Sequence, residues 1–360
     1  MTELERRIAE LIAASGPMSV ADYMVMCLFD PRAGYYTTRE PFGRAGDFVT
    51  APEISQMFGE LVAVWLYSRW KDAGTPKDAV IAEIGPGRGT MMRDMARTFR
   101  QIDPAFCEAA RFALIETSER LRKVQQETLA GAGIEFSWHD SVESLPDGPP
   151  FIVGNELFDA VPIRQFVKTA QGWRERVVGL GKQEELVFLA GASGIDTALL
   201  PPDAATAGEG AIVELAPVRE AMMEAICARV AGSGGAGLFI DYGYLEPAVG
   251  DTLQALREHK YDDVLAHPGE ADITAHVDFA RLRAVAERYD LQAELTSQGK
   301  FLLDQGLLER AGRLGAALDE AGRQTIREAV ERLAAPDQMG ELFKVLAVTS
   351  PPAPDASGLT

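Results

Sequence analysis

"AVIAEIGPGRGTMM", residues 79–92, decides the fold of this chain. It begins as an apolar run of strand length, passes through Gly85, Gly87 and Gly89, and ends in residues that open a helix. Glycine allows the backbone to turn sharply and to come close to a ligand. The N-terminus of the following helix offers free N–H groups and the positive end of the helix dipole. The stretch therefore predicts a strand, a cofactor-binding turn and a helix.

The spacing of the glycines narrows the class of cofactor. A phosphate-binding P-loop ends in Gly-Lys-Ser/Thr, whereas this turn ends in Gly89, Thr90 and Met91. A dinucleotide site needs G-x-G-x-x-G/A, and Thr90 stands at the sixth position. What remains is acid-x-G-x-G-x-G with Glu83 as the acid, which resembles motif I of the class I S-adenosylmethionine (SAM) methyltransferases. A tight turn without a ligand stays the alternative.

Apolar runs on both sides of this stretch have the rhythm of a parallel sheet. Runs of strand length alternate with helical segments, at 79–84, 111–115, 134–138, 151–154 and 236–240. Continuous apolar strands separated by helices indicate a parallel sheet buried on both faces. Between the last two runs, "RQFVKT", "WRERVVGL" and "ELVFLA" alternate like an antiparallel meander. We predict an α/β fold, with a Rossmann-like, mostly parallel sheet of the class I SAM-methyltransferase type, an antiparallel last strand and an inserted meander.

The N-terminal part of the chain is predicted to be helical. "MTELERRIAELIAASG" places Leu4, Ile8, Leu11 and Ile12 at helical spacing. Thr50 and Glu53 form a capping-box pattern ahead of a long apolar stripe. The expected organisation is a helical segment with a cofactor-covering loop at 1–75, the SAM-binding half of the sheet domain at 76–160, an insertion on the substrate side at 161–235, the remainder of the sheet domain at 236–349 and a disordered tail at 350–360.

Composition and charge argue against several classes of protein. The 360 residues are 47% apolar and 25% charged, and their net charge of −19 disfavours nucleic acid as a partner. No apolar run approaches the ~20 residues that span a bilayer, so membrane insertion is not expected. The cysteines are few and far apart, and no histidine is paired with one, so neither a disulfide framework nor a metal site is predicted. The N-terminus resembles neither a signal peptide nor a transit peptide, which predicts a cytoplasmic protein.

Acidic residues follow three successive predicted strands. Glu83 lies at the end of the first, Glu116 ends the run in "RFALIETS", and Asp140 follows "FSWH". The carboxyl ends of neighbouring parallel strands meet at the topological switch point, where ligands bind. Each acid alone could be a helix N-cap, but the three together fit one ligand.

Several blocks of sequence, in the same order over nearly all of residues 15–348, resemble one family. They are "GPMSVADYM", "GYY", "GDFVTAPEISQMFGELVAVW", "EIGPGRGT", "IETSERLRKVQQ", "GNELFDAVPIRQF", "GLFIDYGY", "GDTLQALREHKYDDVLAHPGEADITAHVDF" and "MGELFKVLAV". The family is that of the MidA-like methyltransferases, whose mitochondrial relatives are the complex I assembly factor and protein-arginine methyltransferase. The resemblance implies SAM-dependent methylation of a protein arginine, which in the mitochondrial relatives gives symmetric dimethylarginine on a complex I subunit. Because no transit peptide is seen, the expected member is bacterial and cytoplasmic.

The resemblance also implies roles for residues at the predicted cofactor site. Gly85, Pro86, Gly87 and Gly89 would back the methionyl part of SAM, and Glu83 would lie near its amino group. Glu116 and Thr117 would bind the ribose, and Asp140 would receive the adenine. Gly46, Asp47 and Phe48 are candidates for covering the cofactor.

Asn155, Glu156 and Asp159 lie just beyond the fourth predicted strand, in "FIVGNELFDAVPI". Burying them costs free energy unless each finds a partner. A carboxylate can bind the planar guanidinium of an arginine, orient one nitrogen toward the methyl group and take the released proton. We therefore predict that these residues carry the reaction. In the alternative, Asp159 caps a turn and Asn155 bonds loop backbone.

Further polar and aromatic residues are candidates for contacts with the substrate. Ser55 and Gln56 follow the covering loop, Phe158 lies among the candidate acids, and Asp272 and His276 lie in a polar connection. A structural histidine is the alternative for His276. Two other functions stay open, namely a SAM methyltransferase of a small molecule or lipid and a non-catalytic assembly factor. The oligomeric state is also open, with a homodimer as one candidate.

Overall fold

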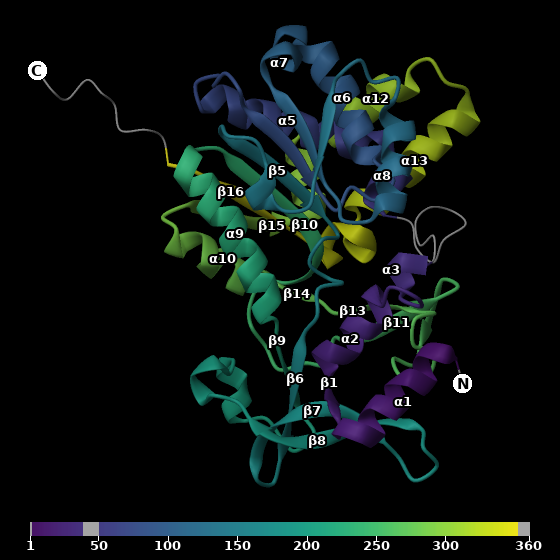
Figure 1. Cartoon of the computed structure of the whole chain (residues 1–360). Helices are drawn as coiled ribbons and strands as arrows, with labels where there is room; N and C mark the ends of the chain where they lie inside the picture. Colours follow the sequence, from purple (N-terminus) through teal and green to yellow (C-terminus); the bar gives the residue numbers. More distant parts are fainter. Residues whose placement is uncertain (1, 39–49, 352–360) are drawn as a thin grey trace, which may run out of the picture. The chain divides into compact units, whose positions relative to one another are not determined.

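The computed structural model describes residues 2–38 and 50–351, which form two compact units (Figure 1). Unit 1 takes its residues from Met1–Val49, Phe158–Ala221 and Tyr244–Ala280. Unit 2 takes its residues from Thr50–Leu157, Met222–Gly243 and Arg281–Thr360. Each unit is thus assembled from segments that lie far apart in the sequence.

Unit 2 is built on a central sheet, of which Figure 1 labels β5, β10, β15 and β16. The strand order is β15-β16-β10-β5-β2-β3-β4. Its strands are β2 (Val80–Ile84), β3 (Arg111–Ile115), β4 (Phe136–His139), β5 (Pro150–Asn155), β10 (Ala236–Tyr244), β15 (Gln292–Ser297) and β16 (Phe343–Thr349). The pairs from β4 to β10 are parallel, and β16 runs antiparallel to both β10 and β15. The predicted fold class is confirmed.

The strand order fixes where a ligand can bind in unit 2. Counted along the chain, the parallel strands run 3-2-1-4-5 across the sheet, with β2 first and β5 fourth. In such doubly wound sheets the switch point lies between the first and fourth strands, and ligands bind at their carboxyl ends. Here β2 ends at Ile84 and β5 ends at Asn155, and Ile84 pairs with Gly154 in the strand register.

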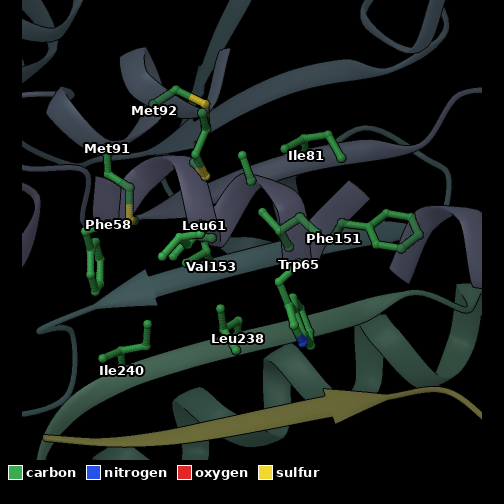
Figure 2. Close-up of a cluster of buried hydrophobic side chains, with 14 of the residues drawn as sticks. Phe58, Leu61, Trp65, Ile81, Met91, Met92, Phe151, Val153, Leu238 and Ile240 are labelled. Atoms are coloured by element: carbon green, nitrogen blue, oxygen red, sulfur yellow. The ribbon is translucent and has the colours of Figure 1, made fainter. Parts of the chain in front are cut away.

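One hydrophobic core of unit 2 takes apolar side chains from α5, α6 and the central strands. Figure 2 shows Phe58, Leu61 and Trp65 of α5 (Gln56–Asp72) together with methionines of α6 (Thr90–Ile102) and side chains of β2, β5 and β10. The remaining helices are α4 (Ala51–Ile54), α7 (Pro104–Ala109), α8 (Glu119–Leu129), η1 (Val142–Ser144), α9 (Pro217–Ser233), α10 (Phe279–Arg288), α11 (Gln298–Asp304), α12 (Leu307–Gly315), α13 (Glu320–Ala334) and η4 (Pro336–Gly340). The apolar stripe predicted at the start of this unit is therefore core packing.

The capping box predicted for Thr50 and Glu53 is wrong. Thr50 precedes α4 but its side chain makes no cap hydrogen bond. Ser55 has an extended backbone that separates α4 from α5, and its Oγ accepts the N–H of Met57 at 3.2 Å. The Glu53 carboxylate instead accepts the hydroxyl of Thr90 at 2.5 Å. A tertiary partner on α6 has therefore replaced the local one, and α4 is tied to the start of α6.

Unit 1 combines short helices with antiparallel sheets. Its larger sheet has the order β1-β7-β6-β9, with β8 pairing β7, and all of these pairs are antiparallel, as predicted for the inserted meander. The elements are α1 (Glu3–Ser15), β1 (Met18–Ser19), α2 (Val20–Phe29), α3 (Tyr35–Thr38), β6 (Arg164–Thr169), β7 (Gly172–Leu180), β8 (Leu186–Gly194), η2 (Thr197–Leu199), η3 (Pro202–Ala205), β9 (Ile212–Leu215), β11 (Gln254–Arg257), β12 (Lys260–Asp262), β13 (Asp272–Thr274) and β14 (Val277–Asp278). Leu4, Ile8 and Ile12 of α1 are buried as expected, whereas Leu11 is 47% exposed.

Across residues 2–38 and 50–351, no helix combines the length and the apolar character needed to cross a membrane.

Candidate active site

The glycine turn after β2 has the backbone that only glycine adopts easily. Gly85, Gly87 and Gly89 have φ angles of 64°, 52° and 81°. The N–H of Gly85 donates to the carbonyl of Ile115 on β3, and the N–H of Gly89 donates to the carbonyl of Pro86. A side chain at these positions would strain the left-handed backbone. The turn therefore brings bare backbone to the carboxyl edge of the sheet.

Glu83, on β2, is a buried acid with an unsatisfied oxygen. The residue is 3% exposed, and burial raises the pKa of its carboxyl group to about 8. The main-chain N–H of Met92 donates to the carboxyl group, but Oε2 has no hydrogen-bond partner among the described residues. Buried polar atoms in native proteins nearly always have a partner, so an orphaned acceptor points to a donor that a ligand brings.

Asn155, at the end of β5, repeats this pattern across the switch point. Its Oδ1 is buried and, within the described parts of the chain, also lacks a partner. Its Nδ2 donates to Oε1 of Glu156 at 3.0 Å. Two orphaned acceptors, on the two strands that flank the switch point, fit a ligand group that carries several N–H donors.

Glu116 follows β3 and is held by its neighbours. Its Oε1 accepts the N–H of Ser118 at 2.7 Å, and its Oε2 accepts Nε2 of Gln125 at 3.2 Å. Burial raises the pKa of its carboxyl group, and these hydrogen bonds, together with the N–H of Thr117, act in the opposite direction. Thr117 itself is exposed. The carboxylate is thus oriented beside the glycine turn rather than free to swing.

Asp140 follows β4 and is more exposed than the other acids. Its Oδ1 accepts Nη2 of Arg122 at 2.5 Å, and its side chain is 80% exposed. Nε of the same arginine donates to the main-chain carbonyl of Glu116 at 2.7 Å. Arg122 therefore bonds both residues that follow the paired strands β3 and β4.

Glu156 has a strained backbone. Its φ angle is 50°, a value that residues other than glycine, asparagine and aspartate seldom adopt. Its N–H donates to the carbonyl of Ile240 on the neighbouring strand β10 at 2.8 Å. Backbone strain held in place by surrounding structure occurs preferentially at functional sites. The left-handed conformation of Glu156 turns the chain away from the direction of β5 and so fixes the direction in which its side chain leaves the backbone.

The candidate catalytic residues are divided by a unit boundary, which falls between Leu157 and Phe158. Asn155 and Glu156 belong to unit 2, whereas Phe158 and Asp159 belong to unit 1. Asp159 is 6% exposed, and its Oδ1 accepts the N–H of Ala160 at 2.7 Å. This contact agrees with the alternative in which Asp159 closes a turn.

The other substrate candidates are placed as follows. Ser55 caps α5, and Gln56 is its first residue. Asp272 in unit 1 is 4% exposed, and its Oδ1 accepts the hydroxyl of Tyr36 at 2.9 Å. The main chain of His276 accepts Nη1 of Arg219 at 2.6 Å and donates to Oγ1 of Thr252 at 3.0 Å.

The remaining predictions concern the covering residues and a metal site. Gly46, Asp47 and Phe48 lie outside the described residues. In the described residues, no group of three or more histidine, cysteine, aspartate or glutamate side chains is placed to hold a metal ion.

Sequence reasoning missed the side chains that hold the acids in place. Arg122 and Gln125 are both on α8, and neither was singled out. One signal was available for Gln125, because it interrupts an apolar stripe formed with Leu121 and Leu129 at a spacing of four residues. A polar residue on the buried face of a helix is informative because it needs a specific partner.

A family match covers most of unit 2 and the inserted strands of unit 1. Residues 61–296 match the family model Methyltransf_28, whose description is "Putative S-adenosyl-L-methionine-dependent methyltransferase". A crystal structure of a superfamily member from Burkholderia thailandensis, bound to S-adenosyl-homocysteine, has the same fold with a TM-score of 0.82 and 29% identity. The match covers 96% of this chain and 92% of that chain.

Curated relatives extend the match over almost the whole chain. The sequence is 34% identical to human "Protein arginine methyltransferase NDUFAF7, mitochondrial", over 97% of this chain and 83% of the human protein. It is also 34% identical to the Drosophila melanogaster homolog, over 96% of this chain and 84% of that protein. Because these relatives are named as mitochondrial proteins, the prediction of a bacterial cytoplasmic protein is wrong on this comparison.

The geometry of unit 2 fits the cofactor of these relatives. S-adenosylmethionine carries an amino group with several N–H donors, and the orphaned oxygens of Glu83 and Asn155 need such donors. Its ribose hydroxyls can donate to a carboxylate such as that of Glu116. This chain therefore belongs to the MidA-like family of S-adenosylmethionine-dependent methyltransferases, which includes the NDUFAF7 proteins, and S-adenosylmethionine is its cofactor.

Proposed function

We propose that this chain methylates an arginine side chain of a protein. The relatives at 34% identity over nearly the full chain are named protein arginine methyltransferases. The observation that carries the proposal is Glu156, an acid with a strained backbone at the end of the strand next to β2, whose side chain is fixed by Asn155. A carboxylate at that place suits a cationic substrate.

Unit 2 supplies the residues that would hold the cofactor. The turn at Gly85, Pro86, Gly87 and Gly89 backs the methionyl part, and Glu83 with Asn155 accepts hydrogen bonds from its amino group. Glu116, with Thr117 beside it, accepts the ribose hydroxyls, and Asp140 lies toward the adenine. When bound, the cofactor supplies a methyl group on a positively charged sulfur. A covering role for Gly46, Asp47 and Phe48 stays a prediction.

The reaction is a displacement in which the protein mainly positions and takes a proton. An arginine nitrogen forms the new N–C bond as the C–S bond breaks, so the nitrogen, carbon and sulfur must be in line. The guanidinium is protonated before transfer and must lose one N–H proton in the course of it. The Glu156 carboxylate binds the guanidinium, aims one nitrogen and accepts that proton. Asn155 holds Oε1 of Glu156 so that one oxygen stays oriented.

The finer identity of the substrate follows from the resemblance of the sequence blocks. On that basis the methylated protein is a subunit of respiratory complex I, and the product is symmetric dimethylarginine. Phe158, Asp159, Asp272, His276, Ser55 and Gln56 stay candidates for contacts with this substrate.

The proposal is tested with methyl-labelled SAM and a lysate from cells that lack the gene. We expect label in a protein band, recovered as dimethylarginine after acid hydrolysis. Label found only in small molecules or lipids would favour a methyltransferase of that kind. Failure to bind SAM in calorimetry would contradict any methyl transfer and leave a non-catalytic assembly factor.

A further inference from the structure

Gln125 of α8 is a fully buried polar residue that contacts three cofactor-site elements of unit 2. It is 0% exposed. Its Nε2 donates to the carbonyl of Gly87 at 2.9 Å and to Oε2 of Glu116 at 3.2 Å. Its Oε1 accepts Nε1 of Trp138 on β4 at 2.9 Å. One amide thus bonds the glycine turn, the acid after β3 and the strand that ends near Asp140.

These contacts leave the amide only one orientation. The NH₂ group has two donors, and both have acceptors, namely a carbonyl and a carboxylate. The amide oxygen faces a group that can only donate, the indole N–H of Trp138. Exchanging the oxygen and nitrogen would break all three hydrogen bonds, so the amide is a fixed spacer between the turn and the acid.

The glycine turn is packed against the same side chain. A Cβ atom built on Gly89 would lie 3.5 Å from Cγ of Gln125. Leu121 and Leu129, one turn away on either side, are buried and face the same way on α8. An apolar residue between them would complete the stripe, so the fold alone does not call for an amide at position 125.

We propose that Gln125 is a positioning residue that aims the Glu116 carboxylate and the Gly87 turn at the ribose and methionyl parts of SAM. The inference rests on the proposed placement of the ribose at Glu116. Donation from Nε2 also favours the charged form of Glu116, because hydrogen bonds to a carboxylate oppose the effect of burial on its pKa. A charged, fixed carboxylate is the better acceptor for ribose hydroxyls.

The test compares two ligands and two variants by titration calorimetry. The ligands are S-adenosyl-homocysteine and its 2′-deoxyribose analogue, which lacks one of the hydroxyls that would donate a hydrogen bond to Glu116. We expect the native protein to prefer the hydroxylated ligand by about tenfold or more, as for one charge-assisted hydrogen bond. In Gln125→Met, which keeps the apolar volume and removes the amide, the preference should fall to about twofold or less.

Gln126→Met is the matched control, because it makes the same chemical change one residue along α8 at an exposed position. It should keep the full preference. Should Gln125→Met fail to fold, Gln125→Glu keeps the length of the side chain and replaces the Nε2 donors with an acceptor, and it should lose the same preference.

The ratio of affinities distinguishes positioning from a structural role. If Gln125 had only a structural role, Gln125→Met would lower the affinity for both ligands by the same factor. The variant would then keep the native preference, and this result would overturn the inference. A native protein that bound both ligands equally would overturn it as well, since Glu116 would then not read the ribose. The proposed function fails separately, through absent protein label with intact ligand binding.

Discussion

Glu156 combines a left-handed backbone with a fixed carboxylate, and its substitution separates binding from transfer. In Glu156→Gln the size of the side chain is kept, but the group can neither accept the proton nor pair with a cation. We expect SAM affinity to stay within about twofold and methyl transfer to fall about a hundredfold or more. Calorimetry and a labelled-methyl assay measure the two quantities. Unchanged turnover would demote Glu156 to a structural residue.

Glu156→Gly offers a control on the strain itself. Glycine adopts a φ of 50° without steric cost. The variant should therefore be as stable as the native protein or more stable, by up to about 1 kcal/mol, even though activity is lost. Urea unfolding of both proteins gives the difference. A clear loss of stability would mean that contacts of the Glu156 side chain stabilise the turn by more than the backbone strain costs.

Glu83 should make cofactor binding depend on pH. Burial raises the pKa of its carboxyl group to about 8, so below that pH most of the free protein carries a neutral acid there. A cationic amino group beside it favours the carboxylate, so binding should release a proton. We expect affinity to increase up to about tenfold per pH unit on the way to about pH 8, and then to level off.

Calorimetry at about pH 6.5 in buffers of different ionisation enthalpy would show this proton directly, as a release of up to about one per ligand. Glu83→Gln cannot titrate, so its affinity should be weaker and flat across the same pH range. Proton release that persisted in this variant would place the titrating group elsewhere.

At the scale of elements, the start of α5 gives a matched pair of substitutions. Ser55 caps the helix by accepting the N–H of Met57, whereas the side chain of Thr50 makes no cap hydrogen bond. Ser55→Ala should lower the free energy of unfolding by about 1 kcal/mol. Thr50→Ala should change it by less than about 0.5 kcal/mol. Equal losses in urea unfolding would contradict the assignment of the cap.

The strands of unit 2 were predictable because both faces of the sheet are buried. The five residues of β2, Val80–Ile84, are all buried, so an apolar run broken only by Glu83 was the signal that the sequence could carry. The break between α4 and α5 was not predictable, because Ser55 fits a helix or a cap equally well. The hydrogen bond from Thr90 to Glu53 joins residues 37 positions apart, so local sequence does not reveal it.

In the candidate site too, residues marked by local sequence could be predicted, whereas residues defined by distant contacts could not. Glu83, Glu116 and Asp140 could be proposed because each lies at or just after the carboxyl end of a strand, and these ends meet in a parallel sheet. The roles of Gln125 and the backbone of Glu156 could not be found from local sequence alone. They depend on Gly87, 38 positions from Gln125, and on the register of β10 beside β5.

At the scale of the whole molecule, charge should influence how an arginine substrate arrives. The chain has a net charge of −19, which attracts a cationic peptide over long range. Raising the salt from about 50 to about 300 mM shortens the screening length and should raise KM for such a peptide severalfold, with kcat nearly unchanged. Steady-state kinetics with saturating SAM measure both constants. A KM that did not respond to salt would argue against long-range attraction.

The division into units was the part of the architecture furthest from the sequence. Boundaries expected at 75, 160 and 235 follow changes in local pattern, whereas the units change over at 49, 157, 221, 243 and 280. Local pattern identifies which element a segment forms. It does not identify which distant segments share its core.

Unit 1 has a consequence for the newly made chain. Tyr23 of α2 donates its hydroxyl to the carbonyl of Val264 at 2.7 Å, and the two residues are 241 positions apart. At a synthesis rate of about 5–20 residues per second, the later residue leaves the ribosome roughly 12 to 48 s after the earlier one. Throughout that interval the apolar faces of α1 and α2 await Ala271 and Ile273 of their shared core. Although α1 and α2 are made before the rest of unit 1, they are therefore among the last of its elements to complete their packing, and a nascent-chain chaperone would have their apolar faces to protect.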